Sequence, residues 1–251
     1  MDWAGTAVDY GCFAPVAAFV ESFRAIGVPV TAAETRAHMG LTKVEEIRAL
    51  FDIERVRAEF ERKFGRPAGE EDVQARYAEF QRVLFASLED YTDPIPGVVE
   101  TISALRAQGI RIGSTTGYTD SMMHIVAPKA ARLGYAPDFW ISPDGVGGRG
   151  RPDPYMIFEN LKALEVPSVK NAVKVGDTVS DIREGVNAGV WSVGVIEGSS
   201  VLGLSQTEYE ALTPEVRRDA CRRAEETFRT AGAHFVLNDL SQLPELIRMI
   251  G

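Results

Sequence analysis

The sequence predicts an α/β protein in which a Rossmann-like core with a parallel sheet carries an inserted, all-helical block. Short apolar segments alternate with helical patterns from Val98 onward, and strands that alternate with helices pair in parallel. Residues 14–92, by contrast, repeat their apolar positions at helical spacing without an intervening strand. We therefore expect a catalytic core of residues 1–13 and 94–251 and a helical cap domain of residues 14–93.

Within the helical block, the first helix is indicated by apolar residues at helical spacing before Gly27: Val16, Phe19, Val20, Phe23 and Ile26. Thr31 to Glu34 and Thr42 to Glu45 both match the Ser/Thr-x-x-Glu capping box, so each is expected to open a helix. Helical patterns follow at residues 54–64 and 70–88. The breaker-rich segment 93–97, Asp-Pro-Ile-Pro-Gly, marks the end of the block.

The remaining chain alternates between the two kinds of element. Strands are expected at residues 110–114, 139–142, 172–175, 191–195 and 234–237, and helices at 98–108, 121–133, 154–164 and 181–187, with one more after the last strand. In a doubly wound sheet, ligands bind beyond the carboxyl ends of the strands. The polar segments that follow these strands are therefore the candidate site.

Composition restricts the class of partner. The net charge of -9 and the pI near 5.0 argue against a nucleic-acid or membrane-surface partner, because either requires a basic face. No apolar run approaches the roughly 20 residues that cross a bilayer. The two cysteines, Cys12 and Cys221, lie far apart and no basic-plus-apolar leader precedes them. We expect a reduced, cytoplasmic setting.

Four segments carry the chemistry: Asp2-Trp3-Ala4-Gly5-Thr6, the run from Ile112 to Gly117, Arg151-Pro152, and the run from Val175 to Asp181. In this order and spacing they resemble the four-part signature of the haloacid dehalogenase superfamily. A fifth segment, Met39-Gly40-Leu41-Thr42-Lys43, is similar to the branch of that superfamily that cleaves carbon–phosphorus bonds. The resemblance covers essentially the whole chain and implies a haloacid dehalogenase-like core with a helical cap.

The resemblance implies hydrolysis of 2-phosphonoacetaldehyde to acetaldehyde and phosphate, in phosphonate catabolism. In it, Asp2 is the nucleophile that attacks phosphorus and Lys43 forms a Schiff base with the aldehyde. Phosphatases of the superfamily usually carry a second aspartate two residues after the nucleophile, which protonates the leaving alkoxide. This chain has Ala4 there. A carbon leaving group that departs as an enamine does not need that acid.

Lys43 requires a neutral amine for this step. Its expected position at the first turn of a helix should depress its pKa, because the positive end of the helix dipole disfavours ammonium. The related enzymes commonly have a histidine three residues later, where this chain has Glu46. A carboxylate there could relay protons but would also stabilise ammonium. His38 is the other candidate for the relay.

Phosphate and metal ligands follow from the same resemblance. Thr116 and Gly117 bind phosphoryl oxygens, and Arg151 pairs with phosphate, with Arg149 as a competing candidate. The other residues that line the site in the resemblance are Cys12, Met39 and Tyr118. The metal ligands are Asp2, the Ala4 carbonyl and Asp177, supported by Asp181, an all-oxygen set that suits Mg²⁺.

In the superfamily a buried strand precedes the nucleophile, so the full-length protein is expected to start roughly 6 to 12 residues upstream of Met1.

The apolar cap and the resemblance favour a homodimer that forms through the cap. The expected partner is a small phosphonate substrate, with no nucleic acid and no membrane. The alternatives are a phosphatase or phosphomutase that acts on a small phosphate ester, and a catalytically silent, truncated member that binds a phosphorylated ligand or a protein.

Overall fold

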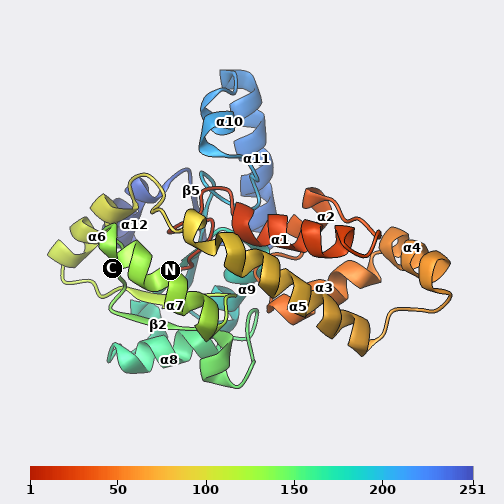
Figure 1. The fold of residues 1–251 in the computed structure, drawn as a ribbon. Coiled ribbons are helices and arrows are strands. Elements are labelled where there is room, and N and C mark those ends of the chain that lie inside the picture. The colour runs from red at the N-terminus through yellow and green to blue at the C-terminus, as the bar shows by residue number, and fades with distance from the viewer. Residues whose placement is uncertain (251) are drawn as a thin grey trace.

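The computed structural model describes residues 1–250, and it places a cluster of helices beside two small parallel sheets with their own covering helices (Figure 1). The cluster comprises α1 (Phe13–Arg24), α2 (Ala32–Arg36), α3 (Lys43–Asp52), α4 (Glu54–Phe64) and α5 (Glu70–Ser87), followed by the 3-10 turn η1 (Leu88–Tyr91). Both predicted capping boxes form: the Thr31 and Thr42 hydroxyls accept hydrogen bonds from the backbone N–H groups of Glu34 and Glu45.

The strands are β1 (Gly113–Thr115), β2 (Phe139–Ile141), β3 (Val173–Gly176), β4 (Trp191–Val195) and β5 (Phe235–Leu237). β1 pairs with β2, and β4 pairs with both β3 and β5, all in parallel. Met1 and Asp2 lie between β1 and β3, because Thr115 N donates to Met1 O and Asp2 N donates to Val175 O. This arrangement confirms the predicted α/β fold with parallel pairing and places Asp2 among the carboxyl ends of the strands.

The helices of the sheet part are α6 (Val98–Ala107), α7 (Asp120–Arg132), α8 (Tyr155–Ala163), α9 (Val179–Ala188), α10 (Gln206–Glu210), α11 (Pro214–Thr230) and α12 (Leu243–Ile250), with 3-10 turns η2 (Pro143–Val146), η3 (Val169–Asn171) and η4 (Leu240–Gln242). The helix expected at residues 98–108 forms and ends one residue earlier, at Ala107. The helix expected at residues 154–164 begins one residue later, at Tyr155, and ends one residue earlier, at Ala163. The α10–α11 pair, which the sequence analysis did not place, projects from the core (Figure 1).

Buried aromatic side chains pack against each other in both the helical cluster and the sheet part. Phe19 of α1 stacks on Phe80 of α5 with 4.2 Å between ring centroids, and Trp3 meets Tyr135 edge to face at 5.0 Å. All four rings are fully buried, and each such side chain contributes about 1.5–3 kcal/mol by leaving water. An apolar cavity of about 190 Å³, bordered by Met1 and Val175, lies between β1 and β3. Among residues 1–250, no helix has the length and apolar character that crossing a bilayer requires.

Candidate active site

A small buried cavity of about 30 Å³ lies where the helical cluster meets the carboxyl ends of the strands. Most of the residues predicted from the sequence line it: Asp2, Ala4, Cys12, Met39, Lys43, Thr116, Gly117, Tyr118 and Arg151. A cavity of this size holds about one or two water molecules. Residues that the chain separates by more than a hundred positions therefore converge on one pocket.

Asp2 and Arg151 form the centre of this pocket. Both side chains are almost fully buried, and the Arg151 guanidinium donates a hydrogen bond to an Asp2 carboxylate oxygen. Arg151 also lies 3.0 Å from Asp181 Oδ1 and 3.1 Å from Glu184 Oε2. The competing candidate Arg149 is exposed and pairs with Asp153 at 3.1 Å. Of the two candidates, Arg151 is therefore the arginine that contacts Asp2.

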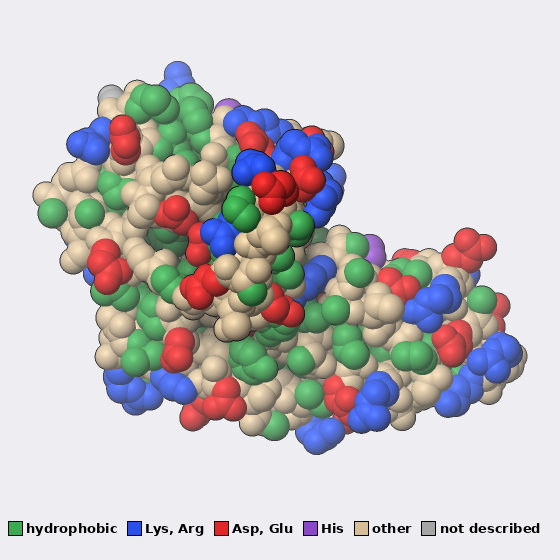
Figure 2. Space-filling model, turned by 90° about the horizontal axis from the view of Figure 1, so that it is seen from above, with side chains coloured by type: hydrophobic (Ala, Val, Ile, Leu, Met, Phe, Trp, Pro, Cys, Tyr) green, Lys and Arg blue, Asp and Glu red, His purple; other side chains and the backbone are tan. Residues whose placement is uncertain are grey.

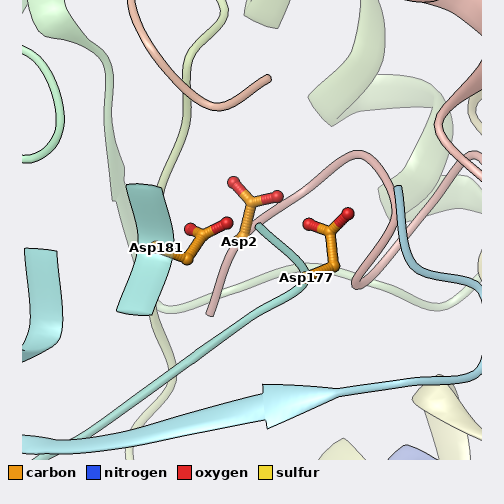
Figure 3. Close-up of side chains that lie close together, drawn as sticks. All are labelled: Asp2, Asp177 and Asp181. Carbon is orange, nitrogen blue, oxygen red and sulfur yellow. The ribbon is translucent and has the colours of Figure 1, made fainter. Parts of the chain in front are cut away.

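Three carboxylates meet at this point. Asp2, Asp177 and Asp181 each offer an oxygen, and these oxygens all lie within 4.8 Å of one another (Figure 3). Asp177 follows β3, where its carboxylate accepts hydrogen bonds from Thr6 Oγ1 at 3.1 Å and Ser200 N at 2.8 Å. A Cβ at Gly5 would lie only 2.2 Å from Asp177 Oδ2, so the approach of the first loop to Asp177 requires glycine.

The electrostatics divide these carboxylates into two kinds. Burial, followed by the charges of Asp2 and Asp181, raises the pKa of Asp177 well above its usual range, and burial also raises the pKa of Asp2. Burial opposes ionisation of Asp181 too, but Arg151 and Lys174 outweigh it and lower the pKa of that carboxyl to about 2. An added cation near Asp2 and Asp177 would therefore favour their ionised forms. Asp181 is already stabilised as a carboxylate by Arg151 and Lys174. The oxygens of Asp2 and Asp177 fit a divalent cation such as Mg²⁺.

Lys174 and Glu184 belong to this network, although the sequence analysis did not identify them. Lys174 Nζ lies 2.9 Å from Asp181 and 2.7 Å from Glu184, and it donates to Thr115 Oγ1 at 2.6 Å. Both side chains are buried. The available signal was a lysine in the middle of an otherwise apolar parallel strand, since charged residues are almost never fully buried without a partner. The pair fixes Thr115 and Asp181 beneath the pocket.

Lys43 reaches the same pocket from the first position of α3. Its side chain is 5 % exposed, and its Nζ lies 3.1 Å from Glu46 Oε1 and 3.2 Å from Glu46 Oε2. The amine also lies 5.8 Å from the centre of the Tyr118 ring. Gly40 N donates to Glu46 Oε1 at 3.1 Å, which holds the carboxylate in place. Burial raises the pKa of Glu46 to about 7, although Lys43 acts in the opposite direction.

His38, the other relay candidate, is placed differently. It lines a neighbouring, larger cavity and is not among the residues that border the pocket of Asp2 and Lys43. Glu46 is the side chain that contacts the Lys43 amine. The geometry therefore favours Glu46 as the partner of Lys43.

The remaining predicted residues complete the walls. Thr116 follows β1, and its hydroxyl accepts a hydrogen bond from Tyr118 N at 3.0 Å. A Cβ at Gly117 would lie 3.1 Å from Leu41 O and 3.8 Å from Lys43 Nζ, so at this point the core loop touches the helical cluster. Burial raises the pKa of the Cys12 thiol and of the Tyr118 phenol well above their usual ranges, and both groups are neutral in the pocket.

Comparison with known families gives a match over most of the chain. A family model described as haloacid dehalogenase-like hydrolase matches residues 1–189. Relatives found by sequence also match over the length of the chain. A phosphonoacetaldehyde hydrolase from Lysinibacillus sphaericus is 50% identical over 250 residues, which cover 100% of this chain and 93% of that protein.

Two further relatives extend the comparison. A bifunctional phosphonoacetaldehyde hydrolase/aminoethylphosphonate transaminase from Clostridioides difficile is 50% identical over 246 residues, which cover 98% of this chain but 38% of that longer protein. Among solved structures, a phosphonoacetaldehyde hydrolase-like protein from Oleispira antarctica superimposes with a TM-score of 0.96 at 36% identity, covering 99% of this chain and 90% of the other.

Proposed function

Because the chain belongs to the haloacid dehalogenase-like hydrolase family and, within it, to the phosphonoacetaldehyde hydrolases, we propose that it hydrolyses 2-phosphonoacetaldehyde to acetaldehyde and phosphate. One observation carries the proposal: the Lys43 amine and the Asp2 carboxylate line one buried pocket. The amine suits the aldehyde end of the substrate and the carboxylate suits the phosphorus end. Both ends of a two-carbon phosphonate would thus be bound by reactive groups.

The first step joins Lys43 to the aldehyde. The Nζ–C bond of an iminium forms, and two protons of the Lys43 ammonium leave with the carbonyl oxygen as water. Glu46 is in hydrogen-bond contact with this amine and is the group that accepts and returns those protons. The buried setting of both side chains keeps competing water away from the iminium.

The second step breaks the carbon–phosphorus bond. An Asp2 oxygen attacks phosphorus, the C–P electron pair moves into the iminium to give an enamine, and the phosphoryl group remains on Asp2. Water then releases phosphate from the aspartyl phosphate. Protonation of the enamine carbon and hydrolysis of the resulting iminium release acetaldehyde and restore Lys43. No alkoxide leaves in this sequence, which agrees with Ala4 in place of a proton-donating aspartate.

The charges of the site serve the phosphoryl group. Arg151 would pair with phosphoryl oxygens while it stays bound to Asp181 and Glu184. Thr116 and the Gly117 backbone line the same pocket. Asp2, Asp177 and the Ala4 carbonyl would hold Mg²⁺, which when bound offsets the charge of the phosphonate and the carboxylates. Asp181 would support the site through Thr178, whose hydroxyl donates to Asp181 Oδ2 at 2.6 Å.

The helical block of residues 14–93 would act as a cap. The pocket is narrow, with a volume of about 30 Å³, and movement of the cap would widen it for substrate entry and close it for reaction. The contact of Gly117 with Leu41 and Lys43 is where the cap would meet the core on closure. Whether the cap also joins two copies of the chain remains a prediction, which analytical ultracentrifugation tests.

Product release tests the proposed function directly. With Mg²⁺ present, the chain should release acetaldehyde and phosphate in equal amounts from phosphonoacetaldehyde. A small phosphate ester such as glycerol 3-phosphate is expected to react far more slowly. Ala4→Asp, which supplies the missing acid, is the matched variant for ester hydrolysis. Faster turnover of the ester by the unaltered chain would contradict the proposal.

Removal of the metal is expected to abolish turnover. Chelation should stop phosphate release, and added Mg²⁺ should restore it. Asp177→Asn is expected to raise the Mg²⁺ concentration for half-maximal activity about tenfold or more, because a ligand charge is lost. Mg²⁺ should also raise the melting temperature of the unaltered chain more than that of Asp177→Asn. Asp219→Asn, an exposed change on α11, is the control. Equal Mg²⁺ requirements in both variants would remove Asp177 from the metal site.

The raised pKa of Glu46 predicts that turnover depends on pH. The carboxylate accepts a proton only when it is ionised, and its pKa lies at about 7. Turnover should therefore fall as the pH drops through about 7. Glu46→Gln should lower kcat by roughly 10²–10³-fold and remove this acid limb, and Glu46→His should recover part of the activity. Glu159→Gln on α8, an exposed partner of Lys162 at the same i,i+3 spacing, is the control. An acid limb that persists in Glu46→Gln would assign the titration to another group.

A further inference from the structure

A second cavity, which we call the antechamber, lies beside the catalytic pocket and has a volume of about 720 Å³. Met39 and Thr178 line both cavities, so the two share a wall. Figure 2 shows the surface hollowed between the helical cluster and the core, with basic and histidine side chains beside the hollow. The antechamber is larger than the pocket and is the adjacent space that could hold a substrate molecule.

The charged residues that line the antechamber are Arg36 and Arg183, together with the imidazole of His38, and no carboxylate among residues 1–250 lines it. The first residues of the ten-residue helix α9, Val179 and Ser180, also line it. A cavity of one sign of charge concentrates ions of the opposite sign.

Arg36 and Arg183 differ in how they are held. Arg36 Nη1 donates to Gly11 O at 2.5 Å and lies 3.4 Å from Ser200 O, so its guanidinium is fixed between the helical cluster and two core loops. Arg183 is exposed on α9. Within residues 1–250 its side chain has no ion pair and no hydrogen bond to another residue. Its charge is therefore available to an anion.

The wall between the two cavities is a close contact of one loop with the start of α9. Gly40 has a φ of +91°, and a Cβ there would lie 2.5 Å from Thr178 Oγ1 and 2.9 Å from Ser180 Cβ. Only glycine permits this approach. The loop that carries Gly40 also holds Glu46 through its backbone N–H. Displacement of this loop would join the antechamber to the catalytic pocket.

We propose that the antechamber is a second anion site, which binds the phosphonate group of incoming substrate and the phosphate product on their way to and from the catalytic pocket. This inference rests on the proposed function for its substrate. The shared chemistry is a small, doubly charged phosphoryl anion. In this proposal Arg183 attracts and binds the incoming anion and takes no part in the reaction. It lines the antechamber, not the catalytic pocket.

The kinetic test is charge reversal at Arg183. Arg183→Glu should lower kcat/KM for phosphonoacetaldehyde about 3- to 10-fold at low ionic strength, with a smaller change in kcat. The difference should shrink to within about twofold in 1 M NaCl, where the Debye length is about 3 Å. The control is Arg132→Glu, which makes the same change in net charge at an exposed position on α7. Equal losses in the two variants, or a loss that salt does not relieve, would overturn the proposal.

A binding test separates this inference from the proposed function. Calorimetric titration with inorganic phosphate needs no turnover. At low ionic strength Arg183→Glu should bind phosphate several-fold more weakly than Arg132→Glu, whatever substrate the enzyme uses. Equal phosphate affinities would overturn the antechamber site even if phosphonoacetaldehyde is hydrolysed. Weaker phosphate binding in Arg183→Glu without hydrolysis of phosphonoacetaldehyde would support the site and contradict only the proposed substrate.

Discussion

Lys43→Met is expected to lower the turnover of phosphonoacetaldehyde by about ten-thousand-fold or more, because the iminium that accepts the C–P electron pair no longer forms. Methionine retains most of the length and apolar stem of lysine, so the packing against Phe19 and Tyr118 should persist. The loss should appear in kcat, since the missing interaction exists only after covalent attachment. Steady-state phosphate release measures it.

The matched control is Lys162→Met. Lys162 forms an i,i+3 pair with Glu159 on α8, as Lys43 does with Glu46 on α3, but its side chain is 79 % exposed instead of 5 %. It should retain full activity. Lys43→Met leaves the buried Glu46 without its cation, so thermal unfolding should accompany the assay. A folded Lys43→Met protein that keeps more than about a tenth of the activity would contradict the Schiff-base mechanism.

Asp2→Asn is expected to abolish phosphate release while leaving Schiff-base formation intact. The amide keeps the shape of the carboxylate but cannot form the aspartyl phosphate. A loss of roughly 10⁴-fold or more in kcat is expected, comparable to removal of other covalent nucleophiles. Asp52→Asn, an exposed change at the end of α3, is the control and should be fully active.

Borohydride separates the two steps in this variant. In the presence of substrate and borohydride, Asp2→Asn should accumulate a 2-phosphonoethyl group on Lys43, because the imine forms but the C–P bond stays intact. If Asp2→Asn instead released acetaldehyde at the normal rate, the nucleophile would have to be another group in the pocket.

Thr116 and Asp177 could be placed from the sequence because each directly follows the end of a strand. Asp2, Thr116 and Asp177 are far apart in the sequence, but the carboxyl ends of parallel strands meet at one edge of a sheet. Lys43 was predictable from its segment, and its capping box correctly placed it at the start of a helix. The strand near residues 110–114 was less well predicted. β1 begins only at Gly113, which pairs with Phe139, the first residue of β2.

Other features depend on contacts that a linear pattern does not contain. Lys174 and Glu184 are stabilised by each other and by Asp181 and Arg151. A lysine within an apolar strand signals that a buried partner exists, but the sequence does not say which carboxylate it is. The preference for Glu46 over His38 is a matter of side-chain direction, since both lie within five residues of Lys43. The antechamber is also invisible in the sequence, because α2, α9 and the loop of Ser200 form it only when folded.

The most direct measurement is mass spectrometry of Lys43 after incubation with phosphonoacetaldehyde and borohydride. In the unaltered chain, Lys43 should carry an ethyl group, because the imine is reduced after the C–P bond has been cleaved. In Asp2→Asn, the same residue should carry a 2-phosphonoethyl group, and in Lys43→Met neither label should appear. Release of acetaldehyde and phosphate by the unaltered chain with no label on Lys43 would contradict C–P cleavage through a lysine imine.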